Sequence, residues 1–258
     1  MRRLGGWADR RVGIAGLALV ALLIPGRLAG QSLSQRMAAV TDGTVRFSFA
    51  ARPGVCGNGR NIFTDRDDRD WERECDDGPV RVVLTVANRR LLSLRSYLGG
   101  RWRAGSAATD WGLVPARAAA ELLLALAGTA DTDAASQAIF PLTLADSVDP
   151  WPGILAMARN PSVRRETRKQ AVFWLGQAAG DVSIRGLDSL LADRTEDRAI
   201  QEQVVFALSR RPSDEAIPAL LRVARTHPDP AIRKRAIFWL AQSGDPRALS
   251  LFEELLLK

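Results

Sequence analysis

Residues 229–249, DPAIRKRAIFWLAQSGDPRAL, contain the signals that decide the fold of the C-terminal half. Asp229 followed by Pro230 is typical of the N-cap and the first residue of a helix. Gly244 followed by Asp245 supplies a helix end and then a second N-cap. The stretch is therefore expected to contain one helix, a short turn and the start of a second helix.

The same pattern recurs upstream. A Phe among apolar neighbours returns at intervals of 33, 33 and 32 residues, at Phe140, Phe173, Phe206 and Phe238. Apolar residues that stand 11, 14 and 18 positions after each Phe lie on one face of a following helix. Helix pairs at such a period stack into a solenoid, because no single pair can bury its apolar face alone. We expect the last three Phe side chains to be buried.

The unit at residues 229–249 resembles the short bacterial HEAT-like repeats, including those named after phycobilisome lyases. It has their Asp-Pro start, an Ile-Arg pair, Ala and Leu on the first helix, and Gly-Asp before an apolar second helix. The resemblance covers residues 130–258. It implies an all-α solenoid of about four helix pairs within residues 113–258, with a degenerate first unit, because Pro141 should break or kink its first helix.

The segment before the solenoid, residues 31–112, reads as a small β-rich domain. Residues 44–50, 79–86 and 91–98 alternate between apolar and polar side chains, which is typical of half-buried strands. Asn88 between the last two runs favours a hairpin turn. The helix expected at 114–127 either covers the sheet or begins the helical array. The predicted fold class is therefore α+β multidomain, a β-rich segment followed by an α-solenoid.

Residues 1–30 have the three-part order of a secretory signal peptide. Four Arg precede a 13-residue apolar run at 12–24, and small residues precede Gln31. The run is short for a membrane helix, which needs about 20 residues; an uncleaved anchor is the alternative. We expect cleavage, no membrane span in the mature chain, and a periplasmic or secreted location. The net charge is +7, and residues 1–30 contribute +4 of it.

Cys56 and Cys75 are the only cysteines. In an exported protein an even pair predicts one disulfide. The loop between them is acidic in its second half, and a calcium loop is the alternative to a solvated one. Arg69 and Asp70 stand where an EF-hand needs a ligand and a glycine, so no metal site is expected.

The sequence contains few candidates for catalytic residues. His227 is the only histidine, it lies in an inter-repeat loop between prolines, and we expect it to be exposed there. No phosphate loop, dinucleotide motif or nucleophile elbow accompanies it. We therefore predict no catalytic residue and no cofactor.

A polar and aromatic stripe on the first helix of each pair is the candidate binding surface. It recurs three residues before, one after and four after the Phe, positions that share one helix face. Its members are Gln170, Trp174, Gln177, Arg210, Arg235, Trp239 and Gln242. Trp and Arg are common interface anchors, although both Trp side chains could instead pack between repeats.

The sequence thus predicts an exported, non-catalytic scaffold that binds a protein or peptide along the solenoid. One alternative is a lyase-like enzyme that attaches a bilin or similar chromophore, as the resemblance allows. A weaker alternative is a nucleic-acid-binding HEAT-like protein. The mature charge of +3 and an exported location both disfavour nucleic acid as the partner.

Overall fold

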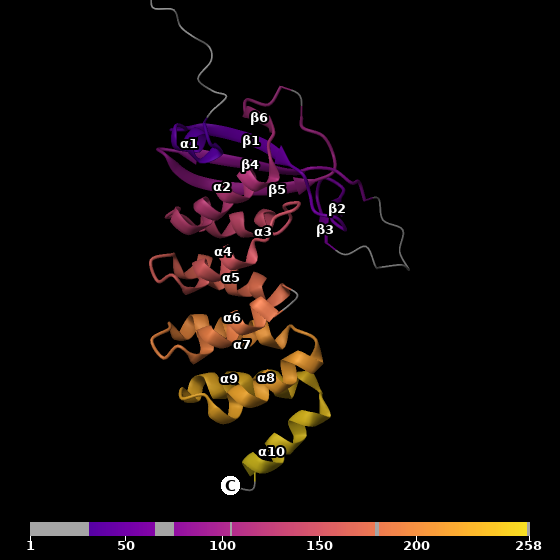
Figure 1. Ribbon diagram of the computed structural model, residues 1–258, viewed down its shortest axis with the longest axis vertical. Coiled ribbons are helices and arrows are strands. Elements are labelled where there is room, and N and C mark those ends of the chain that lie inside the picture. Colours follow the sequence, from indigo (N-terminus) through magenta and orange to yellow (C-terminus); the bar gives the residue numbers. More distant parts are fainter. Residues whose placement is uncertain (1–30, 65–74, 104, 179–180, 257–258) are drawn as a thin grey trace, which may run out of the picture. The chain divides into compact units, whose positions relative to one another are not determined.

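The computed structural model describes residues 31–64, 75–103, 105–178 and 181–256. The predicted signal peptide and most of the acidic loop, residues 65–74, lie outside these ranges. The β-rich segment and the helices belong to one compact unit, Ser32–Lys258. The predicted fold class is confirmed (Figure 1).

The β-rich segment is built on a four-stranded mixed sheet with the order β5-β4-β1-β6. Its strands are β1 (Gly43–Phe49), β4 (Val80–Ala87), β5 (Arg90–Leu98) and β6 (Thr109–Leu113). The three strands expected at 44–50, 79–86 and 91–98 are confirmed and pair antiparallel. Strand β6, which was not predicted, pairs parallel with β1.

Alternation along the strands gives the sheet one apolar face and one polar face. Val45, Phe47 and Phe49 of β1 are buried, as are Val80 and Val82 of β4, while the residues between them are half-buried. The predicted hairpin joins β4 to β5 through two residues with positive φ, Asn88 at 52° and Arg89 at 60°. This left-handed pair is the geometry that matches the twist of a two-residue hairpin.

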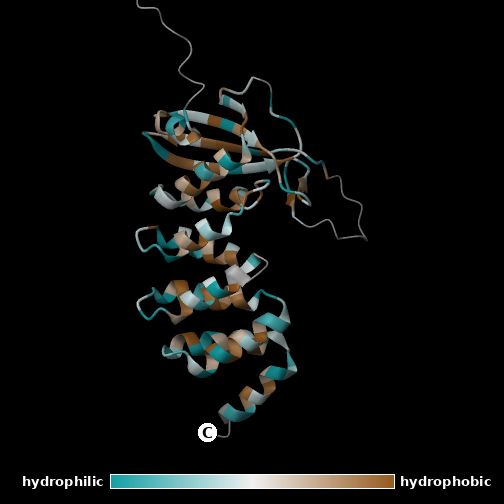
Figure 2. Ribbon diagram, in the orientation of Figure 1, coloured by the Kyte–Doolittle hydropathy of each residue, from teal (hydrophilic) through white to brown (hydrophobic). Residues whose placement is uncertain are grey.

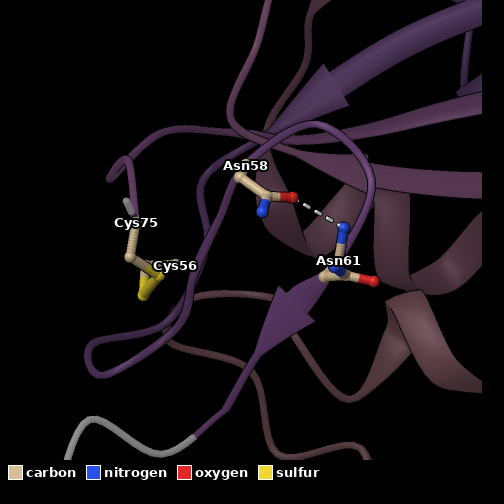
Figure 3. The surroundings of a disulfide bond; sticks show 4 residues. All are labelled: Cys56, Asn58, Asn61 and Cys75. Atoms are coloured by element: carbon tan, nitrogen blue, oxygen red, sulfur yellow. Dashed lines mark hydrogen bonds between the residues drawn. A yellow bond between two sulfur atoms is a disulfide. The ribbon is translucent and has the colours of Figure 1, made fainter. Parts of the chain in front are cut away.

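A second, two-stranded sheet carries the predicted disulfide. Strands β2 (Cys56–Gly57) and β3 (Ile62–Phe63) pair antiparallel. Cys56 and Cys75 are bonded, with their Cα atoms 5.4 Å apart, so the disulfide prediction is confirmed. Figure 3 shows the bond beside the turn of this hairpin, where Asn58 Oδ1 accepts a hydrogen bond from the Asn61 N–H at 2.9 Å.

The helices follow the repeat pattern. Helix α1 (Leu33–Ala38) precedes the sheet, and α2 (Ala116–Thr129) lies beneath it. The four units are η1 (Asp133–Ala138) with α3 (Ile139–Leu142) and α4 (Trp151–Arg159); α5 (Arg165–Gln177) with α6 (Asp181–Ala192); α7 (Arg198–Ser209) with α8 (Ser213–Thr226); and α9 (Pro230–Ser243) with η2 (Pro246–Ala248) and α10 (Leu249–Leu256).

The first unit is degenerate in the way that Pro141 predicts. A 3₁₀ segment and a four-residue helix replace its first helix, because proline has no N–H to donate and clashes with the preceding turn. By contrast, the last unit begins as its sequence predicts: the Asp229 side chain accepts from Ala231 N at 2.8 Å, and Pro230 follows as the first helical residue.

One apolar core runs through the sheet and the helix pairs. Its buried members extend from Leu33 to Leu251, and side chains of α2 belong to it together with those of β1 and α4. Helix α2 therefore has both of the roles that the sequence left as alternatives. It covers the sheet, and it also packs against the first unit. Figure 2 shows apolar residues along the strands and helices and polar ones in the turns. Within the described ranges, no helix has the length and apolarity that a membrane crossing requires.

Candidate functional site

The first helices of successive units form one layer. Helix α5 packs against α7, and α7 packs against α9. Ion pairs repeat across this layer: Arg165 Nε lies 2.7 Å from Asp197 Oδ2, and Arg198 Nε lies 2.8 Å from Asp229 Oδ2. Each of these carboxylates also caps its own helix. Equivalent residues of different units are therefore held in register along the layer.

The capping carboxylates are held in their ionised form. The Ala199 N–H, and after it Arg165, lowers the pKa of Asp197 below its ordinary value. The Ala231 N–H, and after it Arg198, lowers the pKa of Asp229 in the same way. A carboxylate that caps a helix and pairs with a neighbouring unit stabilises both the helix start and the contact between units.

Aromatic rings fill the contacts between first helices. Trp174 is stacked on Phe140 of the preceding unit, with ring centroids 5.0 Å apart. Trp239 likewise contacts Phe206 of its preceding unit, at 5.3 Å, but the two rings are tilted by 51°. Each Trp also meets the Phe before it in its own helix edge-on, at 5.2 Å for Phe173. Both Trp side chains are half-buried against the core. Both Trp side chains therefore pack between repeats, which was the alternative to a role as exposed interface anchors.

The expectation that the repeated Phe side chains are buried was wrong for Phe238, which is 47% exposed, and too strong for Phe173 and Phe206, which are half-buried. Phe206 is covered by the Trp of the next unit, whereas no further first helix packs on Phe238 within the described residues. Fully buried positions of the first helices include instead the Ala or Val two residues before the Phe, as at Ala171 and Val204.

Because Trp174 joins two units, replacing it by Gln should lower the free energy of unfolding by roughly 1 kcal/mol, the contribution of an aromatic pair beyond its buried area. Thermal denaturation of the purified variant measures the loss. Gln170→Ala, an exposed change on the same helix, is the control and should leave the melting temperature unchanged. Equal melting temperatures for the Trp variant and the wild type would show that the stacked ring does not stabilise the array.

Two adjoining hollows lie along this layer. The first, of about 340 Å³, is lined by aromatic rings, an amide and an arginine: Trp151, Phe173, Trp174, Gln177, Arg52, Thr64 and Thr143. The second, of about 280 Å³, is lined by Gly176, Gln177, Ala178, Arg210, Arg211, Pro212 and Glu215. Gln177 lines both, so the two hollows adjoin at the end of α5. We call them together the α5 groove.

The comparisons with known proteins identify the repeats. A family model described as HEAT repeats matches residues 187–258. The helical array is a HEAT-like repeat array. No curated protein and no solved structure matches the chain. HEAT repeats form scaffolds that can mediate protein interaction, because stacked units create one extended surface.

The HEAT units bring together three of the seven predicted binding residues. Trp174, Gln177 and Arg210 all line the α5 groove. The other four stripe residues, Gln170, Arg235, Trp239 and Gln242, line neither hollow of that groove. Arg235 instead reaches Glu202 of the neighbouring HEAT unit at 3.5 Å, and the Nε1 of Trp239 is buried without a hydrogen-bond partner in the described structure.

The sequence missed several groove residues. Arg52 comes from the segment after β1, far from the repeats in sequence, and its Nε donates to the Thr143 carbonyl at 3.1 Å. Arg211 is not part of the repeated sequence pattern, yet its side chain is buried. Its Nε lies 2.6 Å from Glu215 Oε2, and its Nη1 donates to the Ala178 carbonyl at 2.9 Å. Arg211 thus fixes the turn of one HEAT unit against the end of α5.

His227 is buried, and the expectation of an exposed loop histidine was wrong. Its Nε2 lies 3.2 Å from the Leu191 carbonyl oxygen, and its Nδ1 accepts from the Asp229 N–H at 3.2 Å. Both ring nitrogens therefore face backbone groups. The histidine therefore connects two HEAT units. In the described ranges, no group of three or more His, Cys, Asp or Glu side chains is placed to hold a metal ion.

Proposed function

We propose that this protein is an exported, non-catalytic scaffold that binds a peptide segment of a partner protein in the α5 groove. The observation that carries the proposal is the groove itself. Trp174 and Phe173 offer ring surface, and the exposed amide of Gln177 lies where the two hollows adjoin. An apolar anchor beside amide and guanidinium donors suits an extended peptide, whose backbone carbonyls need partners.

The construction of the groove also supports binding. Its walls come from rigid elements: α5 and α7 are held by the Arg165–Asp197 pair, and Arg211 fixes the turn that follows α7. A surface that is ordered before its partner arrives loses less conformational entropy on association. The backbone contacts of both ring nitrogens support a structural role for His227, the only histidine, and this agrees with a non-catalytic scaffold.

Two features support export. Residues 1–30 have the charge and hydropathy order of a signal peptide. The Cys56–Cys75 disulfide suits an oxidising compartment, where such bonds form and persist. The partner is therefore expected in the cell envelope or outside the cell.

Replacing Gln177 and Arg210 by Ala should weaken partner capture without destabilising the array, because both side chains are exposed. Capture from a cell-envelope extract is measured by quantitative mass spectrometry with the wild-type chain and the double variant. We expect a loss of at least about tenfold for the principal partner, the effect of removing anchors worth roughly 1.4 kcal/mol or more.

Gln170→Ala with Arg235→Ala is the matched control, since it removes one amide and one guanidinium from the same helix layer but outside the groove. This control should capture the partner as the wild type does. If both double variants retain capture, or if both lose it equally, the α5 groove is not the binding site.

A further inference from the structure

A second hollow, on the polar face of the four-stranded sheet, is strongly cationic. Its volume is about 510 Å³, within the range typical of small-ligand sites. Six arginines line it: Arg46, Arg60, Arg81, Arg95, Arg101 and Arg103. Tyr97 and Trp102 also line it, and none of the described lining residues is acidic. We call this hollow the arginine pocket.

Strand pairing sets the spacing of the charges in the arginine pocket. Arg46 on β1 and Arg95 on β5 both lie opposite Val83, the residue between them on β4. Arg81 lies opposite Tyr97 in the neighbouring row. Because side chains alternate between the two faces of a strand, these three guanidinium groups rise from the same polar face. They therefore converge from three strands, over the width of a small ligand.

The two half-buried arginines are held in place before any ligand binds. Arg81 Nη1 donates to the Gly99 carbonyl at 2.7 Å. The guanidinium carbons of Arg46 and Arg81 lie 5.0 Å and 5.9 Å from the centre of the Trp102 ring. Such cation–π contacts fix the planes of the guanidinium groups while leaving N–H donors available.

The rim of the arginine pocket depends on a tight turn and on the disulfide hairpin. Gly99 and Gly100 follow β5 with φ of 72° and 65°, a conformation that returns the following residues toward the sheet. The Gly59 N–H donates to the Leu98 carbonyl at 2.8 Å. A Cβ on Gly57 would lie 2.5 Å from that same oxygen, so the hairpin packs closely on the end of β5. This contact places Arg60 at the rim.

Among the described residues, one carboxylate pairs with an arginine of the pocket and offsets part of the charge. Asp110 Oδ2 lies 2.9 Å from Arg46 Nε. The Gly112 N–H, and after it Arg46, lowers the pKa of Asp110 below its ordinary value, so this carboxylate is ionised at neutral pH. Among the described residues, six guanidinium groups line the arginine pocket and one carboxylate pairs with them, which leaves an excess of positive charge. A ligand with a single negative charge would leave most of that excess uncompensated.

We propose that the arginine pocket binds a small ligand that carries a di- or polyphosphate group. Guanidinium forks pair with phosphate oxygens two at a time, and a diphosphate concentrates several negative charges within the volume of this hollow. The assignment does not depend on the α5 groove, because the two surfaces share no lining residue. The scaffold would thus carry a phosphate-ligand site on its sheet in addition to its repeat surface.

Titration calorimetry of the full chain with sodium pyrophosphate at low ionic strength tests the proposal. We expect one site per chain. The variant Arg81→Gln with Arg95→Gln should bind at least about tenfold more weakly, because two charged hydrogen-bond donors are lost. Arg101→Gln with Arg103→Gln changes only exposed side chains on the turn, and we expect it to weaken binding even if the strand variant fails to fold.

The control is Arg89→Gln with Arg117→Gln, which removes the same charge from exposed positions outside the arginine pocket. It should bind pyrophosphate within about twofold of the wild type, since long-range attraction is screened by salt. Any one of four results would overturn the proposal. The wild type could fail to bind pyrophosphate, or the control could lose as much affinity as the pocket variants. Citrate could bind as tightly as pyrophosphate, or a DNA oligonucleotide could bind where pyrophosphate does not.

Discussion

Replacing Arg168 by Met should lower the free energy of unfolding by about 3–5 kcal/mol, because the change leaves the buried Glu196 carboxylate without its cationic partner. Arg168 Nη2 lies 2.6 Å from Glu196 Oε2, and both side chains are only 6% exposed. Arg168 Nε also donates to the Ala158 carbonyl at 2.8 Å. One guanidinium therefore connects α5, the end of α4 and the loop before α7. Chemical denaturation of the variant and the wild type measures the loss.

Removing both charges separates two contributions to the loss of stability, that of the unpaired carboxylate and that of the lost packing. In Arg168→Met with Glu196→Leu, no buried charge remains, and replacing a buried ion pair by apolar side chains is often close to neutral. We expect this double variant to recover much of the lost stability. A double variant that is less stable than Arg168→Met alone would contradict the account, since the ion pair itself would then supply the stability.

The variant Gly176→Ala should destabilise the array by about 1–3 kcal/mol, the usual cost of overpacking a core. A Cβ at this position of α5 would lie 2.8 Å from the Ala207 Cβ and 3.1 Å from the Ala207 Cα, so a backbone would have to move. Gly176 therefore sets the closest approach of α5 and α7. The prediction runs against helix propensity, which favours Ala over Gly by about 1 kcal/mol.

Gly128→Ala in α2 is the matched control. A Cβ there would meet nothing within 4 Å, so the helix preference acts alone, and we expect equal or higher stability. Thermal denaturation of both variants gives the comparison. If Gly176→Ala were as stable as Gly128→Ala, α5 and α7 would not be in the close contact described at Gly176, which lines the α5 groove.

Local chemistry explains what the sequence could predict. The recurrence of Phe at 33 and 32 residues identified the HEAT-like units, because an array must repeat its inter-unit contacts. Asp229 and Pro230 located a helix start, and Pro141 located a broken one, because both effects involve only the neighbouring turn. Strands with a half-buried face were visible from alternation alone.

What the sequence could not predict depends on contacts between distant residues. Strand β6 has little alternation and contains Gly112, and only its parallel pairing with β1 makes it a strand. Periodicity showed that Phe238 and Trp239 occupy positions of the repeated pattern, but it could not decide which of the two rings faces the neighbouring unit. The α5 groove needed Arg52, and the arginine pocket needed three paired strands, so neither could be assembled from spacing along the chain.

The measurement that tests the proposed function most directly is photo-crosslinking from residue 64. Thr64 is exposed and lines the first hollow of the α5 groove, so a benzoylphenylalanine placed there leaves Gln177 and Arg210 intact, and the same probe at Ala156 lies exposed on α4 outside the groove. In cell-envelope extract, position 64 should cross-link the partner whose capture requires Gln177 and Arg210, and position 156 should not. Cross-linking of that partner at position 156 but not at 64 would contradict the proposed function.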